Sequence, residues 1–256
     1  MQQTVTSKDN PSIKLFQKLS SNKKYRSEYR MFTLEGLRLI KDAVNENAPL
    51  HCIFITEGCM EKADFLPKDV QTIIISDELG KRLAMTEGTQ GIFAICRMPE
   101  NPNISSVIKS SGKYIVLHNL QDPGNMGTII RTADAMGVDG VIAINCCDIY
   151  NPKTIRSTMG SLFRTKLCIC GEEEAFTELT SKGITSYASV IDSDAQSLAD
   201  ISFEEGAAVF IGNEGNGLPS ETADRCSKKL TIKMNGNVNS LNAATAASII
   251  MWELTK

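Results

Sequence analysis

Short apolar runs alternate with amphipathic segments along the second half of the chain, from Tyr114 onward. Apolar runs of about four to eight residues are typical of buried strands, and apolar residues spaced three or four apart are typical of helices. The predicted strands are Tyr114–Leu117, Gly140–Ile144, Leu167–Cys170, Thr185–Ser189, Ala207–Ile211 and Leu230–Lys233. The predicted helices are Met126–Met136, Pro152–Phe163, Glu173–Ser181, Ser220–Cys226 and Ser240–Leu254. This alternation predicts an α/β domain with a mostly parallel sheet and helices on both faces.

The first hundred residues predict a smaller, mixed α/β unit. Its predicted strands are Met31–Leu34, Cys52–Thr56, Thr72–Ile75 and Gly91–Cys96, and its predicted helices are Pro11–Leu19, Glu35–Asn45 and Asp77–Ala84. Between Arg97 and Lys113 the chain is rich in Pro, Asn and Ser, a composition typical of linkers. We therefore predict two domains, residues 1–105 and residues 112–256.

Three loops rich in Gly and Asn follow predicted strands in the second domain. They span Asn119–Gly137, Phe210–Pro219 and Ile232–Ala247. Ligands of open α/β sheets bind at the carboxyl ends of the strands. The three loops are therefore expected to form a single pocket.

Each of these loops carries candidate chemistry. The loop glycines permit close approach of the backbone to a ligand, and Arg131, one turn into the first helix, could hold a phosphate through its planar guanidinium. A surface ion pair is the alternative role for that arginine. Glu214, between two glycines, is available for a ligand or for Arg131. Asn239 or Ser240 could cap the last helix, which by itself requires no function.

The sequence lacks the motifs of several other enzyme classes. The chain has no GxxxxGK[ST] phosphate loop, no GxGxxG dinucleotide fingerprint and no Ser/His/Asp set. It has two histidines, and its eight cysteines form no CxxC pair and no zinc spacing. We therefore expect no metal site, and we expect the cysteines to act as small buried hydrophobes.

Composition describes an ordinary globular chain of 256 residues, 42% of them hydrophobic and 22% charged. No apolar run approaches the roughly 20 residues that a membrane span requires. The N-terminus lacks the apolar core of a secretory signal. We therefore expect a cytoplasmic protein without a membrane partner.

Charge is distributed unevenly along the chain. Residues 1–41 contain nine basic and three acidic residues, a net charge of +6, whereas the whole chain carries −3. This asymmetry favours a polyanion bound at the basic end, with a solvated helix face as the alternative. The candidate residues for binding this polyanion are Lys14, Lys18, Lys23, Lys24, Arg26 and Arg30.

Together the three loops resemble the three motifs of the SpoU/TrmH family of RNA ribose 2′-O-methyltransferases, of the SPOUT class. The first motif is represented by Asn125–Gly127 with Arg131, the second by Gly212–Leu218, and the third by Ile232–Met234 with Ser240–Ala243. The N-terminal segment resembles the ribosomal-protein-like substrate-binding domain that often precedes this catalytic domain.

The resemblance implies a parallel-sheet domain whose C-terminus is tucked through a loop as a deep trefoil knot. It also implies S-adenosyl-L-methionine as the cofactor, held largely by backbone, and a homodimer in which Arg131 completes a partner's pocket. The cofactor-binding residues that it implies are Ile211, Gly212, Asn213, Ile232, Met234, Ser240 and Leu241.

The implied reaction is methyl transfer to a ribose 2′-hydroxyl of structured RNA, and 23S rRNA is the expected substrate. The implied catalytic residues are Arg131, Asn125, Glu214, Ser240 and Asn242. Guanidinium stays protonated in proteins, so we expect Arg131 to anchor a phosphate and orient the hydroxyl; the proton acceptor is left open. The alternatives are a tRNA methyltransferase of this family, a non-catalytic RNA-binding protein with the same fold, and an α/β enzyme that uses another nucleotide.

Two positions depart from the family pattern. Lys233 stands where a proline is common, and Ala243 stands where a valine is usual. A lysine facing the adenine pocket would be unexpected, although cofactor contacts there are mostly made by the main chain. The departures therefore bear on cofactor affinity rather than on the chemistry.

Overall fold

The structure, a computed structural model, describes residues 4–256 and divides into two compact units. The first unit comprises residues up to 100 together with residues 150–163, and the second comprises residues 101–149 and 164–256. The first three residues of the predicted N-terminal domain lie outside the described residues. Residues 150–163, which include the helix Pro152–Phe163 predicted for the second domain, thus group with the first unit.

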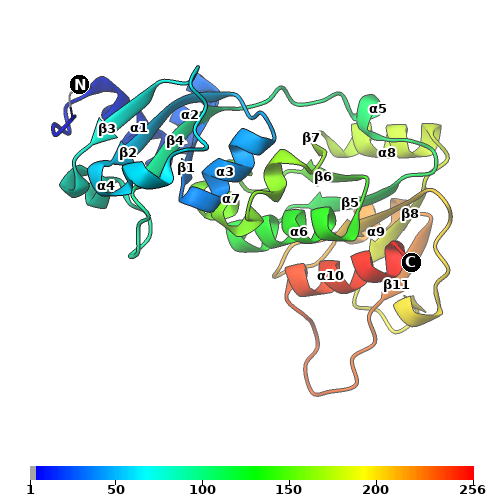
Figure 1. Ribbon diagram of the computed structural model, residues 1–256. Coiled ribbons are helices and arrows are strands. Elements are labelled where there is room, and N and C mark those ends of the chain that lie inside the picture. Colours follow the sequence, from blue (N-terminus) through cyan, green and yellow to red (C-terminus); the bar gives the residue numbers. More distant parts are fainter. Residues whose placement is uncertain (1–3) are drawn as a thin grey trace. The chain divides into compact units, whose positions relative to one another are not determined.

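The first unit contains a four-stranded sheet in the order β1-β4-β2-β3 (Figure 1). Its strands are β1 (Met31–Glu35), β2 (Leu50–Thr56), β3 (Thr72–Ile75) and β4 (Ile92–Arg97). Its helices are α1 (Pro11–Ser21), α2 (Lys23–Tyr29), α3 (Leu37–Asn45), α4 (Asp77–Leu83) and α7 (Pro152–Thr158), with short 3₁₀ turns at Glu57–Lys62 and Ser161–Phe163. The helix α2 was not predicted, because its sequence KKYRSEY has no apolar periodicity.

Two apolar clusters cover the two faces of this sheet. Phe16 of α1 packs edge-on against the rings of Phe54 and Phe93 on one face. On the other face, Ile155 of α7 is buried with residues of β1 and α3, and Tyr150 lies 4.9 Å from Phe32, centroid to centroid. These contacts explain why a segment from the middle of the chain belongs to the first unit.

The second unit contains a seven-stranded sheet in the order β7-β6-β5-β10-β8-β11-β9, and every neighbouring pair is parallel. Its strands are β5 (Lys113–His118), β6 (Gly140–Ile144), β7 (Leu167–Ile169), β8 (Thr185–Ser189), β9 (Gln196–Ser197), β10 (Ala207–Ile211) and β11 (Lys228–Thr231). Its helices are α5 (Ile104–Val107), α6 (Pro123–Met136), α8 (Glu172–Ser181), α9 (Ser220–Arg225) and α10 (Ala243–Leu254), with a 3₁₀ turn at Leu198–Asp200. The predicted α/β class with a parallel sheet is confirmed.

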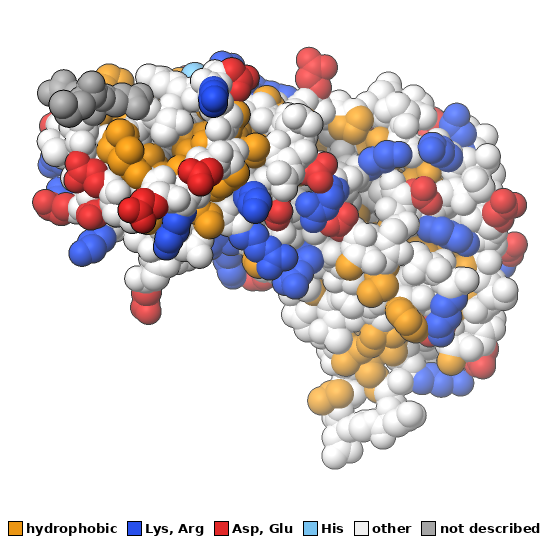
Figure 2. Space-filling view, viewed as in Figure 1, with side chains coloured by type: hydrophobic (Ala, Val, Ile, Leu, Met, Phe, Trp, Pro, Cys, Tyr) orange, Lys and Arg blue, Asp and Glu red, His pale blue; other side chains and the backbone are white. Residues whose placement is uncertain are grey.

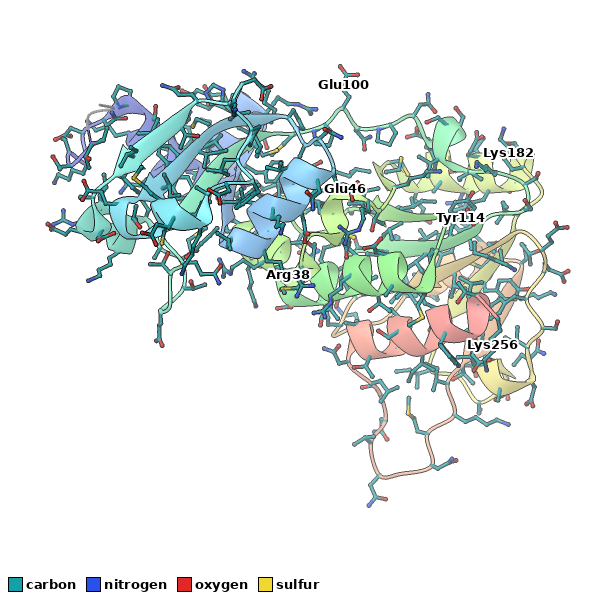
Figure 3. All side chains as sticks on the ribbon, in the orientation of Figure 1. Arg38, Glu46, Glu100, Tyr114, Lys182 and Lys256 are labelled. Carbon is teal, nitrogen blue, oxygen red and sulfur yellow. The ribbon has the colours of Figure 1, made fainter. Side chains whose placement is uncertain are left out.

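Successive side chains along the central strands point to opposite faces of the sheet, so the core of this unit has two layers. Tyr114 (Figure 3) and Val116 of β5 pack in a cluster with α5, α8 and α9, whereas α6 and α10 pack against each other and against the sheet. Buried strands of this kind lie in the middle of three-layered α/β domains. The layers leave the carboxyl ends of the strands open to their loops.

The surface carries charged side chains of both signs between apolar areas (Figure 2). Among residues 4–256, no helix is both long enough and apolar enough to cross a membrane.

Candidate active site

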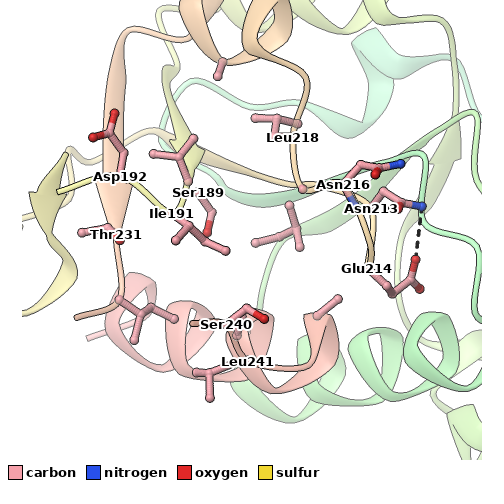
Figure 4. A pocket seen from close by; sticks show the side chains of 18 of the residues that line it. Ser189, Ile191, Asp192, Asn213, Glu214, Asn216, Leu218, Thr231, Ser240 and Leu241 are labelled. Atoms are coloured by element: carbon pink, nitrogen blue, oxygen red, sulfur yellow. Dashed lines mark hydrogen bonds between the residues drawn. The ribbon is translucent and has the colours of Figure 1, made fainter. Parts of the chain in front are cut away.

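A cavity of about 490 Å³ lies at the carboxyl ends of β8, β10 and β11 (Figure 4). Its volume falls within the range of small-molecule sites, about 300–1,000 Å³. The predicted cofactor residues all line it: Ile211, Gly212, Asn213, Ile232, Met234, Ser240 and Leu241. Glu214 lines it as well, whereas Asn125, Arg131 and Asn242 are not part of its wall. Lys233 is exposed and does not line it either.

A fourth strand end, which the sequence did not single out, forms another wall of the cavity. Ser189, the last residue of β8, and the three residues after it, up to Asp192, line the cavity opposite the loop that contains Asn213 (Figure 4). The Asp192 carboxylate accepts a hydrogen bond from the Asp194 N–H at 2.9 Å, which fixes the turn. In the sequence this segment shows only an ordinary strand end. Its place beside β10 follows from the strand order, which the sequence does not state.

The loop after β10 is a tight turn that requires glycine at its start. Asn213 and Gly217 exchange two backbone hydrogen bonds of 2.9 Å, and Gly217 has a positive φ of 67°. The side-chain oxygen of Asn213 also accepts from the N–H groups of Gly215 and Asn216, at 2.9 and 3.1 Å. A Cβ at Gly212 would lie 2.1 Å from the carbonyl carbon of Gly217. The returning chain therefore leaves no room for a side chain there.

The Glu214 carboxylate joins this loop to the loop after β5. It accepts hydrogen bonds from the N–H groups of Asp122 and Gln121, at 2.9 and 3.1 Å, and from the side-chain amide of Asn125 at 3.1 Å. A longer bond of 3.4 Å comes from the Asn213 amide. Partial burial opposes ionisation, but these donors outweigh it and lower the pKa of the Glu214 carboxyl. Glu214 forms no ion pair with Arg131 anywhere in the described structure, since N–H groups occupy its oxygens.

Asn125 and Asn242 extend the connection to the third loop. Asn242 donates from its side-chain amide to the Asn125 oxygen at 2.9 Å. Its own side-chain oxygen accepts from the N–H groups of Ala244 and Thr245, so Asn242 is the N-cap of α10. The predicted caps Asn239 and Ser240 are therefore wrong, because the helix begins later than the run of polar residues suggested.

Arg131 is exposed on α6, and no ion pair or hydrogen bond of its guanidinium is found within residues 4–256. The alternative role of Arg131, a surface ion pair, is therefore not supported, because no acidic partner is found in that range. The helix α6 is fixed beside α10, where the hydroxyls of Thr132 and Ser248 are 3.3 Å apart. The helix α6 therefore presents to solvent a guanidinium that has no partner among the described residues.

The candidate RNA-binding residues of the first unit fall into different environments. Arg26 does not fit an RNA surface, because it is only 3% exposed and donates to the Leu19 carbonyl at 2.6 Å. Arg30 donates to the Pro99 carbonyl at 2.9 Å, and Lys14 pairs with Asp9 at 2.8 Å.

The lysines farther along these helices are more accessible. Lys18 lies over the Tyr25 ring, 5.0 Å from its centroid. Lys23 and Lys24 are exposed without a side-chain partner in the described structure. The predicted basic surface of α1 and α2 is therefore only partly available to a ligand.

The cysteines are free thiols, and burial raises the pKa of Cys52 to about 11 and that of Cys96 to about 12. Within residues 4–256, no group of three or more His, Cys, Asp or Glu side chains has the arrangement of a metal site.

Fold and site together define a parallel α/β domain with a small-molecule cavity at its strand ends and, on α6, an arginine without a partner in residues 4–256. The SpoU rRNA methylase family matches residues 112–252, and a substrate-binding domain of the MRM3-like kind matches residues 10–94. The chain belongs to the SpoU rRNA methylase family.

Individual relatives extend this similarity over nearly the whole chain. The 23S rRNA (guanosine(2553)-2'-O)-methyltransferase RlmP of Bacillus subtilis is 30% identical over 98% of both chains. An AdoMet-bound rRNA methyltransferase from Sinorhizobium meliloti superposes with a TM-score of 0.87 at 28% identity, covering 98% of this chain and 97% of the other. AviRb from Streptomyces viridochromogenes in complex with AdoMet gives a TM-score of 0.87 at 25% identity, covering 96% and 97%.

Proposed function

We propose that this protein transfers a methyl group from S-adenosylmethionine to a ribose 2′-hydroxyl of 23S rRNA. The observation that carries the proposal is the cavity, which gathers residues from the second and third motif loops at adjoining strand ends. Hydrogen bonds of Asn125 join the first loop to the other two. Relatives that resemble the whole chain act on 23S rRNA or were crystallised with AdoMet.

In this proposal the residues of the cavity and of the three loops have different roles. The cavity would hold the cofactor through the backbone around Gly212 and Leu241, and Lys233 would stay in solvent. Glu214, Asn125 and Asn242 would hold the three loops in register without acting on the methyl group. Methyl transfer depends on placing the hydroxyl in line with the sulfonium carbon, so such rigid positioning supplies much of the rate.

Arg131 would bind a phosphate of the RNA and orient the target hydroxyl. Its guanidinium is exposed and unpaired within residues 4–256, and it lies outside the cavity wall of its own subunit. These features support a homodimer in which Arg131 faces the partner's cofactor. Ser240, which lines the cavity, would contact the ribose or the cofactor.

The trefoil knot is part of the same proposal. Residues 232–242 lead from β11 past the cavity to α10, which packs against β5, β10 and α6. This return of the C-terminal segment toward the middle of the sheet supports a threaded chain. We also propose a catalytic domain starting near residue 112, a substrate-binding domain before it, and a cytoplasmic location, since ribosomal RNA is the proposed substrate.

A transfer assay tests the proposal. Purified protein, tritium-labelled S-adenosylmethionine and an unmodified full-length 23S rRNA transcript should give incorporation at one nucleotide, with the adjacent phosphodiester resistant to alkali. Incorporation into tRNA instead would favour a tRNA enzyme of the same family. RNA binding without incorporation into any RNA would favour the non-catalytic alternative, and failure to bind S-adenosylhomocysteine in calorimetry would favour another nucleotide.

A further inference from the structure

The first unit carries basic residues on a second surface, formed by α3 and α7. These two helices contain Arg38, Lys41, Lys153 and Arg156 but only one acidic residue, Asp42. Lys and Arg side chains gather over them in Figure 2, and Figure 3 labels Arg38. Arg156 and Lys153 are far along the chain from the basic N-terminal segment, so sequence order alone did not connect them with it.

A close contact brings the two helices together. A Cβ at Gly160 would lie 2.2 Å from a carboxylate oxygen of Asp42, so the turn after α7 rests against α3. Arg38 precedes Asp42 by one helical turn, Lys41 is its direct neighbour, and Arg156 lies four residues before Gly160. Arg38 and Lys41 therefore lie on the helix that this contact joins to the turn after α7, and Arg156 lies on α7 itself. We refer to these three residues as the α3–α7 basic face.

The cations of this face have no partner within the described range. No ion pair or side-chain hydrogen bond of Arg38, Lys41 or Arg156 is found in residues 4–256, even though Asp42 lies on the same helix as two of them. Arg156 is also half-buried. A guanidinium remains charged in proteins, and partial burial of a charge without a partner is unfavourable. The missing partner is therefore expected to be an anion that binds from outside.

We propose that the α3–α7 basic face binds the phosphate backbone of the RNA substrate. This proposal rests on the proposed function and identifies the surface of the first unit that grips the RNA. Two of the three residues are arginines, whose planar fork matches phosphate oxygens. By contrast, Arg26 and Arg30, which belong to the basic surface predicted from the sequence, donate hydrogen bonds to backbone carbonyls. RNA would thus contact α3 and α7 more strongly than α1 and α2.

The test compares matched charge-neutralising variants of the full chain. The α3–α7 variant is Arg38→Gln/Lys41→Gln/Arg156→Gln. The α2 control is Lys23→Gln/Lys24→Gln, which removes two exposed lysines that have no side-chain partner in the part of the chain that the structure describes. Binding to the full-length 23S rRNA transcript is measured at several salt concentrations. The thermal unfolding curve of each full-length variant reports whether the first unit, which carries all the substitutions, remains folded.

The α3–α7 variant should bind the transcript about tenfold or more weakly. Its log–log salt slope should fall by about two to three, because each phosphate contact contributes roughly 0.7–0.9. The α2 control should lose less affinity than the α3–α7 variant, because it removes two lysines and leaves both arginines in place. A second variant, Arg38→Gln/Lys41→Gln, leaves half-buried Arg156 in place. The log–log salt slope of this variant should fall by about one to two.

Unchanged affinity and slope in the α3–α7 variant, or a larger loss in the α2 control, would overturn the proposal. So would a wild-type chain that does not bind the transcript. If the wild type binds the transcript without methylating it, the proposed function fails while the comparison of variants still decides this surface.

Discussion

The side-chain amide of Asn242 donates a hydrogen bond to the side-chain oxygen of Asn125 at 2.9 Å, although 117 residues separate them in the chain. Asn125 in turn donates to Glu214 at 3.1 Å. One asparagine therefore connects all three motif loops, and each of its side-chain atoms has one defined partner. An amide suits this position because it combines an acceptor with a donor.

Asn125→Asp should destabilise the protein at pH 8 more than at pH 5. The new carboxylate would keep the bond from Asn242 but would lie against Glu214, and two like charges so close favour uptake of a proton. The melting temperature at pH 8 should fall by about 2–4 °C or more, with partial recovery at pH 5. Thermal scans at both pH values measure this, with Asn237→Asp in the exposed third loop as control. Equal losses at both pH values would exclude repulsion as the cause.

Gly212→Ala should weaken binding of S-adenosylhomocysteine about tenfold or more, which corresponds to at least roughly 1.4 kcal/mol. The added methyl group would lie 2.1 Å from the Gly217 backbone and would push the cavity wall out of place. Gly215→Ala is the matched control, because its Cβ would meet only the Asn213 side chain at 3.5 Å. Calorimetry compares the two variants. Similar affinities would mean that the loop does not shape the cofactor site.

Arg131→Ala should abolish methyl transfer while leaving S-adenosylhomocysteine affinity nearly unchanged. The reason is that Arg131 lies outside the cavity wall and is proposed to act on RNA. Arg131→Lys should restore only a small part of the rate, because an ammonium cannot reproduce the two-pronged contact with phosphate. Single-turnover transfer and calorimetry separate the two effects. A parallel loss of transfer and cofactor binding would contradict this role.

Glu214→Gln should lower thermal stability at pH 7, with a difference from wild type that shrinks in acid. The folded-state pKa of Glu214 lies below its ordinary value of 4.5. The stability that the carboxylate contributes is therefore complete above about pH 4.5 and is lost as the pH falls through the lowered pKa. Melting temperatures from pH 7 to pH 3 test this, with exposed Glu87→Gln as control. A difference that does not change with pH would show that charge is not involved.

Several elements could be predicted closely from local sequence. The strands Gly140–Ile144, Thr185–Ser189 and Ala207–Ile211 have the predicted bounds, because each is a short run of residues between loop signals and is at least partly buried. The predicted end of the last strand was wrong. β11 ends at Thr231, and Ile232 and Met234 leave the sheet to line the cavity instead. Local pattern cannot distinguish an apolar residue in a strand from one in a ligand pocket.

The spacing of glycines and asparagines in three strand-end loops was enough, by itself, to indicate the family to which the chain belongs. The prediction that all three loops form one pocket was wrong, because only the second and third loops line the cavity and the first is joined to them by hydrogen bonds. Three features became apparent only in the tertiary structure: Ser189–Asp192 form a further wall of the cavity, Arg26 is buried, and residues 150–163 belong to the first unit. Periodicity and turn chemistry are local properties of a sequence, so they can be read directly. Strand order, burial of a given charge and contacts such as Asn125–Asn242 depend on which distant segments meet, and no local pattern specifies that.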